Sequence, residues 1–100
     1  NNALSADAIR VDAGAVSTDT TTICADIHGN TATTTAVGLF GIRVRQRFAG
    51  TSFILEDYAG APTDDAAVQT FLSTTNNGAT TSADHAGAGF TTIADCPTPP

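Results

Sequence analysis

Gly-Ile-Arg-Val-Arg-Gln-Arg-Phe, residues 41–48, is the stretch of sequence that indicates the fold most directly. Arginines alternate here with apolar or amide side chains. Successive side chains of a β-strand point to opposite faces, so the alternation predicts a strand with one core face and one solvated face. The core face carries Ile42, Val44, Gln46 and Phe48, and the solvated face carries Arg43, Arg45 and Arg47.

An earlier Ile-Arg-Val triplet occurs at residues 9–11, and each copy follows an asparagine-containing turn. The asparagines at 2 and 30 are 28 residues apart, and the triplets at 9 and 42 are 33 residues apart. An approximate repeat of this length is typical of solenoids, whose coils stack strand on strand. We therefore predict an all-β chain in which residues 1–60 are coils of a right-handed parallel β-helix. An antiparallel β-sandwich is the alternative.

Two further strands are expected on either side of residues 41–48. Residues 21–28 are rich in threonine and isoleucine, and residues 52–58 contain Phe-Ile-Leu. The second of these is expected to form a hairpin with residues 41–48, in which Glu56 or Asp57 faces the arginines.

The C-terminal part, residues 61–100, is expected to cap the coils within a single domain of residues 1–100. Thr63 or Asp64 begins a short helix that runs to about Thr74, with an apolar stripe of Val68, Phe71 and Leu72. Residues 75–89 are small and polar, which predicts an irregular tail with a turn at Asn77-Gly78. A last strand at residues 90–93 precedes Pro97, Pro99 and Pro100, which end the fold.

Composition excludes several classes of partner. The chain has ten acidic residues, four arginines, no lysine and a formal net charge of −6, so nucleic acid and anionic membranes are poor partners. No apolar run approaches the ~20 residues that span a bilayer. Threonine, which suits sheets, is frequent, whereas glutamate occurs once.

The two cysteines, Cys24 and Cys96, are expected to form a disulfide, because nothing near them has the short spacing of a metal site. Two buried free thiols or half of a metal site are the alternatives. A loop of this length predicts a stabilisation of roughly 4 kcal/mol in the chain-entropy model. A disulfide also implies an oxidising compartment. We interpret it as the anchor that ties the C-terminal cap onto the coils.

No catalytic signature is present, and we predict that the chain is not an enzyme and has no metal or cofactor. Asp26 and His28 lie two apart and share a strand face, as metal ligands or an acid-base pair do, but no third partner is evident. Asp84 and His85 are expected in a flexible loop, which is a poor platform for catalysis.

The most plausible recognition surface is the arginine row, Arg43, Arg45 and Arg47, together with Tyr58. Three guanidinium groups about 7 Å apart match carboxylates or acidic sugars. Internal neutralisation by acidic neighbours, Glu56 and Asp57 among them, is the competing interpretation.

Several motifs together resemble the repeat-rich, right-handed parallel β-helix segments of large secreted bacterial surface or adhesin-like proteins. They are Asp26 to Asn30, Gly41 to Phe48, Tyr58-Ala59-Gly60, Asp65 to Val68 and Cys96-Pro97. The resemblance implies an extracellular, structural, self-assembling surface or fibre module, with neighbouring segments of a longer chain or other copies as partners. A carbohydrate-binding or adhesive module that recognises acidic glycans is the alternative function, and a fragment of a polysaccharide-degrading enzyme is a third.

Overall fold

The computed structural model describes residues 2–3, 8–31, 33–34 and 40–97. These residues form eight strands and one helix. In chain order the elements are β1 (Asn2–Ala3), β2 (Ile9–Ala13), β3 (Thr22–Ala25), β4 (Thr33–Thr34), β5 (Ile42–Gln46), β6 (Ser52–Glu56), α1 (Asp65–Thr75), β7 (Thr81–His85) and β8 (Phe90–Ile93).

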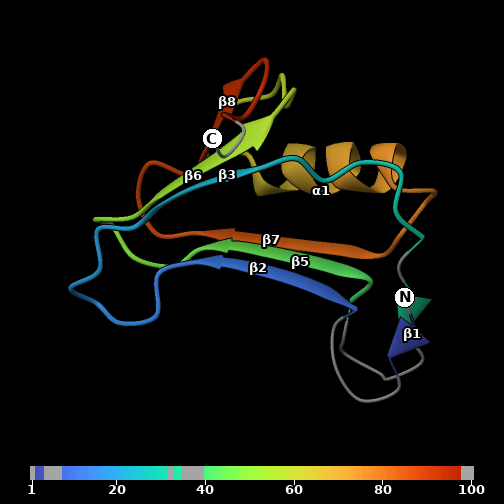
Figure 1. Ribbon diagram of the computed structural model, residues 1–100, viewed down its shortest axis with the longest axis horizontal. Coiled ribbons are helices and arrows are strands. Elements are labelled where there is room, and N and C mark those ends of the chain that lie inside the picture. Colours follow the sequence, from blue (N-terminus) through green and yellow to red (C-terminus); the bar gives the residue numbers. More distant parts are fainter. Residues whose placement is uncertain (1, 4–7, 32, 35–39, 98–100) are drawn as a thin grey trace.

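The strands form three parallel sheets. Their orders are β1-β4, β2-β5-β7 and β3-β6-β8, and every pairing described is parallel. In Figure 1, β2, β5 and β7 lie side by side as one layer, and α1 runs along β7. Because no described pair is antiparallel, the β-sandwich alternative is wrong for this part of the chain.

The two Ile-Arg-Val triplets are partners in the first of the larger sheets. Ile9 pairs with Ile42 and Val11 with Val44, so the two triplets lie side by side in register. Equivalent side chains therefore stack on the same face, and the core face predicted from the alternation is buried at Ile42 and Val44. Complete burial of such a side chain stabilises the fold by about 1.5–3 kcal/mol.

The predicted all-β, right-handed β-helix is nevertheless wrong. The structure has two three-stranded parallel sheets and an 11-residue helix, and no closed or solenoid sheet is seen in the described part of the chain. The physical reason lies in residues 57–80, which connect β6 to β7. Residues 57–80 contain α1 and no strand. The β1-β4 sheet therefore receives no third strand from this segment, whereas β7 and β8 are the third strands of the other two sheets.

Two local predictions also need correction. The expected hairpin of residues 41–48 with 52–58 is absent, because β5 and β6 belong to different sheets. The expected irregular tail over residues 75–89 contains β7, which pairs with β5 from Thr81 to His85. Pro99 and Pro100 lie outside the described residues.

The predicted helix is confirmed as α1. The Asp64 carboxylate accepts a hydrogen bond from Ala67 N at 3.1 Å and caps the first turn. Val68 and Leu72 are fully buried one turn apart. The helix ends in the predicted turn, where Asn77 and Gly78 have φ values of 56° and 73°, a backbone conformation that suits these two residue types. Within the described residues, no helix is long and apolar enough to cross a membrane.

A buried polar side chain, Gln46, holds the ends of the sheets together. Its Oε1 accepts hydrogen bonds from Ala86 N and Gly87 N at 2.9 Å and from Gly89 N at 3.3 Å. Its Nε2 donates to the carbonyl oxygens of two residues after β5, Phe48 and Thr51. Gln46 thus lies on the predicted core face, where its amide forms hydrogen bonds with backbone groups of two turns.

Candidate functional site

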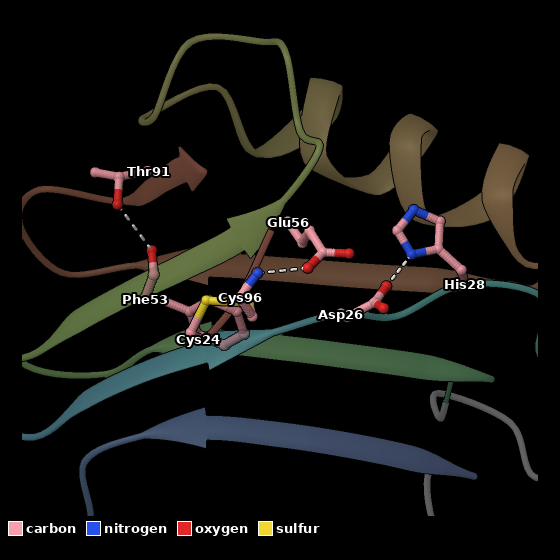
Figure 2. The surroundings of a disulfide bond; sticks show 7 residues. All are labelled: Cys24, Asp26, His28, Phe53, Glu56, Thr91 and Cys96. Carbon is pink, nitrogen blue, oxygen red and sulfur yellow. Dashed lines mark hydrogen bonds and ion pairs between the residues drawn. A yellow bond between two sulfur atoms is a disulfide. The ribbon is translucent and has the colours of Figure 1, made fainter. Parts of the chain in front are cut away.

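The predicted disulfide between Cys24 and Cys96 is confirmed, with a Cα–Cα distance of 5.7 Å. It joins β3 to the segment that follows β8 (Figure 2). Cys96 N also donates a hydrogen bond of 2.5 Å to Glu56 Oε1, at the end of β6. The bridge and this hydrogen bond together connect all three strands of the β3-β6-β8 sheet.

Beside the disulfide lies a cluster of three side chains, Asp26, His28 and Glu56, which we call the Asp-His-Glu cluster. Each offers one carboxylate oxygen or ring nitrogen, and these atoms all lie within 4.8 Å of one another. His28 Nδ1 contacts the Asp26 carboxylate directly, and Figure 2 shows both beside Glu56. The pair noticed in the sequence therefore has a third partner.

Strand pairing explains why Glu56 joins the pair. Ala25 and Leu55 are register partners in β3 and β6, so the next residues, Asp26 and Glu56, leave the ends of neighbouring parallel strands at the same edge. His28 follows two residues later and returns to the same side.

The imidazole of His28 is oriented by two further neighbours. Its Nε2 lies 3.9 Å from Asp57 Oδ2, on the side away from Asp26. Its ring packs edge-on against Phe71 of α1, with centroids 6.0 Å apart. The ring is therefore held between α1 and the strand ends.

The loop that carries His28 is attached to the end of α1 through Asn76, which is completely buried. Asn76 Nδ2 donates to Ile27 O at 3.0 Å, and its Oδ1 accepts from Asn30 N at 3.1 Å. Gly29 N also donates to Thr75 O at 2.8 Å. These bonds limit the freedom of His28 on both sides, although its side chain remains partly open to solvent.

The arginine row makes internal contacts. Arg45 donates two hydrogen bonds of 2.8 Å to the Asp12 carboxylate, its register partner in β2. Arg47 approaches Gly14 O at 3.4 Å, and Arg43 lies over the ring of Phe40 at 5.3 Å. Within the row, Asp12 rather than Glu56 or Asp57 neutralises Arg45. The register of β2 with β5 brings these two residues together.

Tyr58 is buried and its hydroxyl donates to Ala61 O at 2.6 Å. Burial raises the pKa of this phenol, with Asp64 contributing repulsion. An open pocket of about 470 Å³ lies beside it, with Phe71 and Asp64 among its lining residues. The apolar wall and the acidic rim do not match an acidic glycan.

Asp84 and His85 lie on β7, not in the flexible loop that the sequence predicts. His85 Nδ1 lies 2.8 Å from Asp65 Oδ1 and thereby links the strand to the first turn of α1. Asp84 is the register partner of Arg45. His85 and Asp65 are thus a second histidine-carboxylate pair, and their contact joins β7 to α1.

Comparison with protein-family models, with curated proteins and with solved structures gives no match. The described part of the chain is a disulfide-bonded module of parallel sheets with one helix.

Proposed function

We propose that the chain is a non-catalytic structural module of an exported protein, and that it associates with a second copy of itself through the outer edge of β2. The observation that carries the proposal is the position of β2. It is the first strand of the β2-β5-β7 sheet, and β5 is the one strand paired with it among the described residues.

The hydrogen-bonding pattern identifies which backbone groups of β2 face outward. Ile9 N donates to Gly41 O at 2.9 Å, and Ala13 O accepts from Arg47 N at 3.1 Å, so these residues face β5. Backbone groups alternate in direction along a strand, and those of Arg10 and Asp12 therefore face away from β5. An edge of this kind is a template for strand addition.

The charges of β2 favour pairing with itself. If two copies pair antiparallel about Val11, then Arg10 of each copy stands opposite Asp12 of the other. Opposite charges across an antiparallel pair are favourable, and a two-fold interface uses the same patch on both copies. Arg10 is exposed and already lies 3.1 Å from Asp12 of its own strand.

Export to an oxidising compartment is the second part of the proposal. The Cys24–Cys96 disulfide supports it, because such bonds persist mainly outside the cytosol. The extracellular surface and fibre roles implied by the family resemblance belong to this proposal as well.

Sedimentation equilibrium of the disulfide-intact chain tests the association. We expect a concentration-dependent dimer that Arg10→Pro abolishes, because proline removes the outward N–H of the edge. Arg10→Ala is the matched control, since it removes the same side chain and keeps the N–H, and it should retain most of the association. A monomer at every concentration, or a proline variant that associates like the unmodified chain, would show the proposal to be wrong.

Two contacts count against the alternative of glycan binding. The Arg45 guanidinium is bound to Asp12, and Tyr58 is buried.

A further inference from the structure

The Asp-His-Glu cluster has the composition of a metal site. Two carboxylates and one imidazole converge from the ends of β3 and β6, with their ligand atoms within 4.8 Å of one another. Neighbouring ligands of a tetrahedral zinc ion are about 3.3 Å apart, given bond lengths of 2.0–2.2 Å. An ion would therefore require shifts of these side chains, and those of Asp26 and His28 are exposed.

The donor set selects among cations. Calcium and magnesium take oxygen ligands almost entirely, whereas an imidazole nitrogen favours zinc and related transition ions. Three protein ligands also leave one tetrahedral position for water. We propose that Asp26, His28 and Glu56 form a binding site for one Zn²⁺ ion, with Nδ1 as the ligating nitrogen of His28.

An outer ring of contacts supports this assignment independently of the three ligands. Metal-bound histidines usually present their second nitrogen to a carboxylate, which fixes the ring. Asp57 Oδ2 lies on that side of the ring, 3.9 Å from His28 Nε2, which is an ion-pair distance and longer than a hydrogen bond. Its backbone has a φ of 64°, in the left-handed region that aspartate adopts more readily than most non-glycine residues.

Glu56 is positioned by a hydrogen bond from Cys96, one of the two disulfide-bonded cysteines. One of its carboxylate oxygens accepts the hydrogen bond from Cys96 N, and the other extends toward His28 in Figure 2. A carboxylate fixed at one oxygen loses less side-chain entropy when the second oxygen binds an ion. The disulfide thus prepares the site as well as closing the fold.

The excess of negative charge around His28 also favours a cation. Three carboxylates, those of Asp26, Glu56 and Asp57, surround one imidazole. The arginine ion pairs described, from Arg10 and Arg45, both end on Asp12 in the other sheet. A divalent cation would neutralise this excess of negative charge.

Isothermal titration of the disulfide-intact chain with ZnCl₂ tests the site, and CaCl₂ is the comparison ion. A thiol assay first confirms that both cysteines are oxidised, because free thiolates bind zinc themselves. The variants are His28→Gln and Glu56→Gln, and the matched control is His85→Gln, which removes the histidine of the other carboxylate pair. Glutamine at position 56 keeps an oxygen that accepts from Cys96 N.

We expect one Zn²⁺ per chain, no comparable binding of Ca²⁺, and affinity at least about tenfold weaker in both site variants but unchanged in His85→Gln. Should Glu56→Gln fail to fold by circular dichroism, Asp26→Asn at an exposed position takes its place. The proposal is overturned if the unmodified chain shows no saturable zinc binding, if binding survives His28→Gln, or if His85→Gln loses as much affinity as His28→Gln.

Discussion

The two three-stranded sheets share a parallel topology but are stabilised in different ways. In the β2-β5-β7 sheet, β5 buries Ile42, Val44 and Gln46 completely, and α1 packs on β7. In the β3-β6-β8 sheet the central strand β6 also buries Phe53 and Leu55 completely, but the outer strands are more exposed than β2 and β7. Phe90 is the single buried residue of β8, and β3 buries none of its four residues completely.

Covalent and polar links compensate for the weaker burial of the second sheet. The disulfide joins β3 to the end of β8, and Phe90 packs edge-on against Phe53 of β6 with centroids 5.0 Å apart. The two sheets share one hydrophobic core with α1. We infer that the β3-β6-β8 sheet, whose outer strands are more exposed, depends more on the cross-link than the β2-β5-β7 sheet does.

The largest effect is expected from removal of the disulfide. The double variant Cys24→Ala/Cys96→Ala should lose roughly 4 kcal/mol of unfolding free energy, because the bridge closes a loop of 72 residues in the unfolded chain. Urea unfolding followed by circular dichroism measures the change. A loss below about 1 kcal/mol would mean that burial alone holds the β3-β6-β8 sheet.

Gln46→Leu should cost about 3 kcal/mol, since it removes the side-chain acceptor of three N–H groups and the donor to Thr51 O, while Phe48 O keeps its hydrogen bonds from Thr51. Gln69→Leu is the matched control, because the Gln69 side chain accepts one described bond, from Ala83 N, and its loss should cost about 1 kcal/mol. Equal losses in thermal or urea unfolding would contradict the special role given to Gln46.

Asp12→Asn should have a smaller effect, about 1 kcal/mol. Asparagine keeps the size but removes the charge that Arg45 binds through two hydrogen bonds at a partly buried position. Arg45→Gln with Asp12→Asn completes a double-mutant cycle. A coupling energy indistinguishable from zero would show that the pair contributes nothing to the β2-β5 contact.

Acidification should loosen the turn after β2 and leave the global fold intact. Hydrogen bonds from Ala15 N and Val16 N lower the pKa of Asp19. These bonds are complete above the ordinary carboxyl pKa of about 3.9 and are lost as the pH falls through the lowered value. Amide shifts of residues 15 and 16 should follow this titration by NMR, and Asp19→Ala should remove it. Amide shifts of residues 15 and 16 that do not change between about pH 5 and pH 2 would contradict the role given to Asp19.

Sequence patterns predicted the strongest local features and the contact between the two triplets. Ile9-Arg10-Val11 and Ile42-Arg43-Val44 pair because identical alternation stacks identical faces, and the helix follows from its cap and apolar stripe. Patterning failed where neighbours determine structure. The side chains of Thr81–His85 are mostly small and polar. This segment nevertheless forms β7, because it pairs with β5 and contacts α1.

The sequence indicated two of the three residues of the Asp-His-Glu cluster. Asp26 and His28 are close in the chain, so their shared face follows from strand geometry alone. Glu56 is 30 positions beyond Asp26, and no sequence echo relates residues 22–25 to 52–55. Only the register of β3 with β6, in which Ala25 pairs with Leu55, brings Glu56 to the pair.

Residue-resolved amide hydrogen exchange of the oxidised chain and the Cys24→Ala/Cys96→Ala variant tests the central claim that the two sheets are held by different means. The account predicts that protection falls strongly in β3 and β8 while β5 and β7 keep most of theirs. A uniform loss across both sheets, or unchanged protection in β3 and β8, would contradict it.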